Sequence, residues 1–124
     1  MISKEEWMSK ALNQAIKGYD NNEVPIGSII VKDDKIIGKG YNQTECLNDS
    51  TAHAELLAIT SASNTISDWR LNDCSIYVTK EPCLMCFGAI VNSRIKNLFY
   101  GFIDKEKGFR KNINIDYLFL KKHL

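Results

Sequence analysis

Two short motifs, well separated in the chain, constrain the fold most, because each puts metal-binding residue types at a predicted helix start. The motifs are His53-Ala54-Glu55 and Pro82-Cys83-Leu84-Met85-Cys86. One imidazole and two thiolates form a ligand set for zinc that leaves one tetrahedral position open, as catalytic zinc sites do. The carboxylate of Glu55 is then free to move protons at a water in that position. A fold that uses both motifs must bring the two helix starts together.

The local chemistry supports a metal site, although each motif also has a simpler interpretation. Cys83 and Cys86 are three residues apart, so their sulfur atoms lie on one face of a helix, and the positive helix N-terminus favours thiolates. Cys-x-x-Cys alone is also typical of redox proteins, and Glu55 alone could interact only with the helix dipole. The three-ligand set favours the metal site and the proton-transfer role over these alternatives.

Length and composition place the chain among ordinary globular proteins. With 124 residues, 44% hydrophobic and 25% charged, it is expected to form a single domain over residues 1–124. No apolar run approaches the roughly 18 residues of a membrane span, and the charged N-terminus has no apolar signal core. We therefore expect no membrane association and a cytoplasmic location. In that reducing compartment Cys46 and Cys74 are predicted to be free packing residues, and His123 is a poor ligand candidate.

The charge is nearly balanced overall but divided unevenly along the chain. The net charge is +1, with 6 basic and 9 acidic side chains in residues 1–62 and 10 basic and 6 acidic side chains in residues 63–124. Scattered lysines usually form a solvated surface, whereas a one-sided basic field attracts a phosphate backbone. Composition alone leaves both interpretations open.

Hydrophobic periodicity predicts alternating helices and strands. Ser3 and Glu6 form a capping box, a polar turn at residues 33–35 joins two strands, and Pro82 suits the first turn of a helix. The order α-β-β-α-β-α-β predicts one sheet covered by helices.

The expected segments follow from the same periodicity. Helices are expected from Ser3 to about residues 18–22, at 52–63 and at 83–93, and the apolar side of the second consists of Leu56, Leu57, Ile59 and Ala62. Strands are expected at 26–31, 36–41, 75–79 and 97–102, with a polar loop at 42–51 and a short helix or last strand at 117–120.

The two motifs resemble those of the cytidine deaminase superfamily, and their flanking stretches resemble its bacterial tRNA-specific adenosine deaminases. Ser93-Arg94-Ile95 and the Tyr-Gly-x-x-Asp-x-x-x-Gly pattern that ends at Gly108 point to the tRNA branch. The other matching stretches, spread over most of residues 5–108, are Glu23-Val24-Pro25-Ile26-Gly27, Thr51-Ala52 before His53, Tyr77-Val78-Thr79-Lys80-Glu81 before Pro82, and Gly88-Ala89-Ile90.

This resemblance implies a fold, a metal and a reaction. The implied fold is a three-layer α/β/α arrangement with a mixed central sheet of four to five strands flanked by helices. The implied cofactor is Zn²⁺, held by His53, Cys83 and Cys86, with Glu55 as the catalytic residue. The implied reaction is hydrolytic deamination of adenosine to inosine at the wobble position of a tRNA anticodon arm, carried out by a homodimer.

The resemblance also implies which residues contact the substrate. Asn42 would hold the nucleotide, Val24 and Pro25 would form a wall of the base pocket, and the backbone of Ala54 and Pro82 would contact the reacting base. From the residues alone, Asn42 could equally be a turn residue, and Val24 and Pro25 could be ordinary residues at the entry to a strand.

Some positions depart from the family pattern. Lys80 stands where relatives usually have an apolar residue, Phe87 replaces a small residue, and Glu106 stands where a lysine is common. Relatives usually continue through another strand and a basic C-terminal helix, whereas only residues 109–124 follow here. A deaminase of a free nucleobase or nucleoside, of guanine or cytidine type, is therefore the alternative function. A zinc domain without activity is a third interpretation, which the intact Glu55 argues against.

Overall fold

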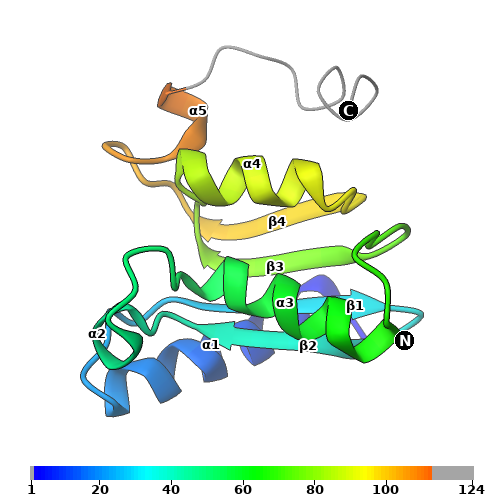
Figure 1. Ribbon diagram of the computed structural model, residues 1–124, viewed down its shortest axis with the longest axis horizontal. Coiled ribbons are helices and arrows are strands. Elements are labelled where there is room, and N and C mark those ends of the chain that lie inside the picture. Colours follow the sequence, from blue (N-terminus) through cyan, green and yellow to red (C-terminus); the bar gives the residue numbers. More distant parts are fainter. Residues whose placement is uncertain (1, 113–124) are drawn as a thin grey trace.

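The computed structural model describes residues 2–112, which form one mixed sheet between two layers of helices (Figure 1). The sheet order is β2-β1-β3-β4; β1 runs antiparallel to β2 and β3, and β3 runs parallel to β4. The predicted α/β fold class and mixed sheet are thereby confirmed. The elements are α1 (Lys4–Asp20), β1 (Gly27–Lys32), β2 (Lys35–Tyr41), α2 (Thr44–Leu47), α3 (Ala54–Ile66), β3 (Ser75–Lys80), α4 (Leu84–Asn92), β4 (Asn97–Phe102) and α5 (Phe109–Asn112).

Alternation along the central strands divides the core between the two faces of the sheet. The face toward α1 forms one buried cluster, made of Trp7, Ala11, Ile29, Val31 and Tyr77. The opposite face packs against α3 and α4 in a second cluster, made of Ile30, Ala58, Ala62, Leu71, Cys74, Ile76, Ile90 and Ile95. Because both faces of β1 are covered, this strand reads as a continuous apolar run. None of the helices within residues 2–112 has the length and apolar character needed to cross a membrane.

The local signals at the N-terminal helix and the hairpin act as predicted. The Ser3 hydroxyl accepts a hydrogen bond from the Glu6 backbone N–H (3.1 Å), and the Glu6 carboxylate accepts one from the Ser3 N–H (3.4 Å). Asp33 and Asp34 both have positive φ, 51° and 59°, the backbone conformation that a two-residue hairpin turn requires. The short helix α2 interrupts the predicted polar loop at residues 42–51. The polar composition of this segment gave no sign of a helix.

Helix α3 lies directly on β2, because two glycines of the strand face the backbone of the helix. A Cβ on Gly38 would lie 2.5 Å from the Ala58 carbonyl oxygen, and one on Gly40 would lie 2.7 Å from the Ala58 backbone nitrogen. Both atoms belong to the backbone and cannot move aside, so only glycine fits at these two positions. The close approach of α3 and β2 fixes where the first turn of α3 emerges from the sheet.

Several sequence expectations about packing are wrong. On the expected apolar side of α3, Ala62 is buried in the core and Ile59 packs against it, but Leu56 and Leu57 are only half-buried. The helix is instead fully buried at Ala54 and Ala58, which the pattern did not single out. Pro82 does not lie in the first turn of α4 but one residue before the N-cap, Cys83. Cys74 is buried as expected, but Cys46 is exposed. The segment at residues 117–120 and His123 lie outside the described residues.

Replacing Gly40 by Ala should force α3 away from β2, because the added Cβ meets backbone atoms. We expect the free energy of unfolding, measured by urea denaturation, to fall by about 1–3 kcal/mol. Gly88→Ala is the matched control, since a Cβ on that residue of α4 meets nothing within 4 Å. It should raise stability by about 0.5–1 kcal/mol through helix propensity. Equal effects of the two variants would contradict close packing of α3 on β2.

Candidate active site

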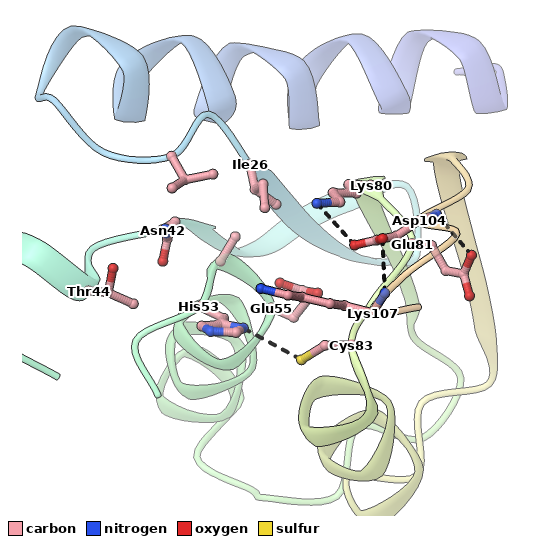
Figure 2. A pocket seen from close by; sticks show the side chains of 12 residues that line it. Ile26, Asn42, Thr44, His53, Glu55, Lys80, Glu81, Cys83, Asp104 and Lys107 are labelled. Atoms are coloured by element: carbon pink, nitrogen blue, oxygen red, sulfur yellow. Dashed lines mark hydrogen bonds and ion pairs between the residues drawn. The ribbon is translucent and has the colours of Figure 1, made fainter. Parts of the chain in front are cut away.

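The two predicted motifs meet because each begins a helix at the same end of the sheet (Figure 1). His53 is the N-cap of α3 and Cys83 is the N-cap of α4, and both have extended backbone conformations. N-cap side chains commonly bond to the backbone of the first helical turn, but the His53 ring does not. The His53 and Cys83 side chains point toward each other in the space between the helix starts (Figure 2). Cys86 follows in the first turn of α4 and is buried.

The distances within the His53, Cys83 and Cys86 cluster fit a metal ion. His53 Nδ1 lies 3.7 Å from Cys83 Sγ and 3.4 Å from Cys86 Sγ, and all three ligand atoms lie within 4.8 Å of one another. Tetrahedral zinc with bonds of about 2.3 Å to sulfur and about 2.0 Å to nitrogen would separate these ligand atoms by about 3.6 Å. The described residues therefore offer three ligands at a spacing that a tetrahedral ion can span.

The two thiols of the cluster differ in their acidity. A hydrogen bond from the Cys86 thiol lowers the pKa of Cys83 to about 5, so Cys83 is a thiolate at neutral pH. The same hydrogen bond, together with burial, raises the pKa of Cys86. A nearby cation would favour ionisation of Cys86 as well, because metal ligands bind in the deprotonated form.

Glu55 is a buried carboxyl group in the first turn of α3, two residues after His53. It is 4% exposed, and this burial is the main cause of the upward shift of its pKa. A buried carboxyl group beside a reacting centre can both accept and return a proton. The side chain lines the same pocket as His53 and Cys83 but is not one of the three clustered ligands.

A pocket of about 290 Å³ opens above this cluster (Figure 2). Among the predicted site residues, the pocket is lined by Val24, Asn42, His53, Ala54, Glu55 and Cys83. Pro25 is exposed and Pro82 is fully buried, and neither lines the pocket. The Pro82 carbonyl oxygen instead accepts a hydrogen bond from the backbone N–H of Phe109 at 3.0 Å.

Asn42 has an unusual environment among the residues that line the pocket. Its backbone N–H donates to the Ile26 carbonyl oxygen at 3.1 Å, and the residue is only 7% exposed. The side-chain carbonyl oxygen is buried, and no group in residues 2–112 donates a hydrogen bond to it. Since buried polar atoms nearly always have a partner, this oxygen is available to a donor on a bound molecule.

The sequence interpretation missed half of the pocket. Six further residues line it: Ile26, Thr44, Lys80, Glu81, Asp104 and Lys107. Lys80 forms an ion pair with Asp104 at 3.0 Å. Hydrogen bonds from the backbone of Lys107 and Glu106, and the Lys80 ammonium, lower the pKa of Asp104 to about 2. The stretches that resemble the family contain Ile26, Lys80, Glu81 and Asp104, but nothing in the sequence assigns them to the pocket wall, and no signal marks Thr44 or Lys107.

Comparison with known proteins agrees with this architecture. The family model for MafB19-like deaminases matches residues 2–123. A tRNA-specific adenosine deaminase of Buchnera aphidicola subsp. Schizaphis graminum is 47% identical over 95% of this chain and 83% of its own length.

Two solved structures superpose on the chain equally well. One comes from a study of A-to-I editing by tRNA:A34 deaminases at the wobble position; its TM-score is 0.82 and its identity 41%, covering 85% of this chain and 76% of its own. The other is a guanine deaminase from Bacillus subtilis, with a TM-score of 0.82 and 35% identity, covering 98% of this chain and 76% of its own. The chain belongs to the MafB19-like deaminase family, within the cytidine deaminase superfamily that its motifs predicted.

Proposed function

We propose that this chain is a zinc-dependent tRNA adenosine deaminase, which converts adenosine to inosine at the wobble position of an anticodon arm. The observation that carries the reaction type is the cluster of His53, Cys83 and Cys86 beside the buried Glu55. The substrate is supported by the tRNA-specific adenosine deaminase of 47% identity, of which the chain covers 83%. The homodimer that the resemblance implies and the cytoplasmic location expected from the sequence stay predictions.

The residues present fit the zinc ion that this chemistry needs. His53, Cys83 and Cys86 would hold it, since the nitrogen and the sulfur atoms are already near tetrahedral spacing. Bound zinc would supply Lewis acidity that lowers the pKa of a water molecule to about 7. No fourth protein ligand joins the cluster among the described residues, so one position would remain for that water.

Glu55 would carry the protons of the reaction. It would accept a proton from the attacking water and pass it to the ring nitrogen next to C6 of adenine. It would then take the second proton, from the new C6 hydroxyl, and deliver it to the amine, so that the C6 carbonyl forms, the C–N bond breaks and ammonia leaves. Water supplies the oxygen of the product, and the carboxylate returns to its starting state.

The remaining predicted residues would bind the nucleotide. The partnerless side-chain oxygen of Asn42 would accept a hydrogen bond from a substrate hydroxyl or amine, and Val24 would pack against the base. Ala54 would contact the base through its backbone, as its position in the pocket wall allows. For Pro25 and Pro82 the proposed contact has less support, because neither lines the pocket.

One observation favours a second candidate function, the deamination of free guanine. The guanine deaminase from Bacillus subtilis superposes with the same TM-score, 0.82, and covers more of this chain than the tRNA:A34 deaminase structure does. The two candidates share the reaction and differ in the size of the substrate, so turnover of the two substrates, each measured separately, distinguishes them.

Incubation of the zinc-loaded protein with an anticodon stem-loop that carries adenosine at the wobble position should yield inosine, detected by nucleoside mass spectrometry. The same stem-loop with guanosine at that position is the matched control and should stay unchanged. Ammonia release from free guanine, without conversion of the stem-loop, would favour the second candidate. No turnover of either substrate would overturn the proposed activity.

Glu55→Gln should keep one zinc per chain but lower kcat by about 10²–10⁴-fold, because the amide cannot carry the proton. Cys83→Ser should lower the zinc content itself, measured by elemental analysis. Cys46→Ser is the matched control, since this cysteine is exposed and lies outside the cluster; it should change neither quantity. Normal turnover by Glu55→Gln would exclude the proton-transfer role.

Asn42→Ala should raise KM by about tenfold with little change in kcat, the effect of losing one hydrogen bond of about 1.4 kcal/mol to the substrate. Steady-state kinetics on the stem-loop measure the two constants. If Asn42 serves only as a turn residue, the variant will instead lose thermal stability while KM stays constant.

A further inference from the structure

Glu81 is a buried carboxylate whose side chain accepts hydrogen bonds from backbone N–H groups. Within residues 2–112, no hydrogen bond joins it to the ligand cluster or to another side chain. It follows β3 directly and is 3% exposed. One carboxylate oxygen accepts the backbone N–H of Asp104 at 3.2 Å, and the other accepts the backbone N–H of Arg110 at 3.0 Å. A buried charge requires such compensation. Glu81 therefore ties together both ends of the segment at residues 104–110, which we call the rim loop.

The rim loop fits closely around this carboxylate. A Cβ on Gly108 would overlap the carboxylate group of Glu81. Two backbone hydrogen bonds hold the rim loop and the end of β4 to the chain around Glu81. The Glu81 N–H donates to the Phe102 carbonyl oxygen at 2.8 Å, and the Phe109 N–H donates to the Pro82 carbonyl oxygen at 3.0 Å. The chain next to the ligand Cys83 and the rim loop are thus joined through one side chain and its neighbouring backbone.

The rim loop carries charged side chains into the pocket. Asp104 accepts the backbone N–H groups of Glu106 and Lys107, both at 3.0 Å, and pairs with Lys80. Figure 2 shows the Lys107 side chain extending from the loop into the pocket. No acceptor for its ammonium group was found within residues 2–112. An ammonium group without a partner beside a base-sized pocket is suited to the phosphate backbone that flanks a base.

A comparable buried carboxylate lies outside the pocket lining, beside the segment that carries Thr44. Glu23 is 6% exposed, and its two oxygens accept the backbone N–H groups of Glu45 at 3.1 Å and Cys46 at 2.8 Å. It holds α2, which places Thr44 in the pocket wall. Glu23 can therefore serve as a control for Glu81. Both carboxylates are buried and accept two backbone N–H groups, but the segment that Glu23 holds does not contain Lys107.

We propose that Glu81 is a positioning residue for substrate recognition, which holds the rim loop so that Lys107 binds a phosphate next to the reacting nucleotide. This inference rests on the proposed function, because a free base has no phosphate. The rim loop would then select a polynucleotide over a free base, whereas the ligand cluster and Glu55 would carry out the deamination.

Glu81→Gln keeps the shape of the side chain but replaces one acceptor oxygen by an amide donor that would face a backbone N–H. On the stem-loop we expect KM to rise by at least about fivefold, with kcat within twofold of wild type and one zinc per chain. The dependence of log KM on log salt should weaken by about one unit, the contribution of one phosphate contact. Lys107→Ala should give the same KM and the same salt slope.

A double-mutant cycle separates positioning from a general loss of structure. If Glu81 acts through Lys107, the variant carrying both substitutions should be no worse than either single one, whereas Glu23→Gln and Lys107→Ala should multiply their effects. Glu45→Gln is the charge-matched control: this glutamate is exposed, and its substitution should leave KM and the salt slope unchanged.

The two hypotheses fail in different ways. If the wild-type protein does not convert the stem-loop, the proposed function is overturned and this inference with it. If the wild type is active but Lys107→Ala leaves KM and the salt slope unchanged, only the inference is overturned, and this holds even where Glu81→Gln does not fold. Effects of Glu81→Gln and Lys107→Ala that multiply, or a loss of kcat and zinc at constant KM, would likewise overturn it.

Discussion

The close packing of α3 on β2 is the interaction on which the site depends. Without a Cβ at Gly38 and Gly40, the helix backbone rests almost on the strand, so the position of its first turn is set by backbone contact rather than by adaptable side chains. His53 caps that turn and Glu55 lies within it. On the other side of the site, parallel pairing of β3 with β4 and the crossover helix α4 place Cys83 at the same end of the sheet.

The meeting of two helix N-termini also prepares the electrostatics of the site. Each helix start exposes backbone N–H groups and positive partial charge, and here both face one small volume. That field favours the thiolate of Cys83 and would assist a second anion nearby. Burial acts in the opposite direction on Glu55. The pKa values of two acidic groups near these helix ends thus shift in opposite directions, because a thiol hydrogen bond lowers the pKa of Cys83 and removal from water raises the pKa of Glu55.

The sequence was a good guide wherever a signal was local. The capping box at Ser3, the turn at Asp33 and Asp34, and the strand at residues 97–102 all lie where the pattern predicts. The ligand cluster was predictable because its residue types are rare and their spacing is characteristic of zinc sites. The pocket wall was not, since Lys107 reaches it only through parallel strand pairing and the hydrogen bonds to Glu81. The buried side of α3 was predicted at Ala62 but missed at Ala58, because close packing selects alanine where hydrophobicity favours leucine.

The cluster joins two stretches of chain that otherwise meet only along the sheet and through helix contacts. His53 belongs to the stretch that includes the β1–β2 hairpin and α3, and Cys83 and Cys86 belong to the β3-α4-β4 unit. A metal bound between them would act as a cross-link that closes the loop from residue 53 to residue 86, much as a disulfide restricts an unfolded chain. Its binding free energy would become folding free energy, so the same ion that supports chemistry would also keep the two halves of the domain in register.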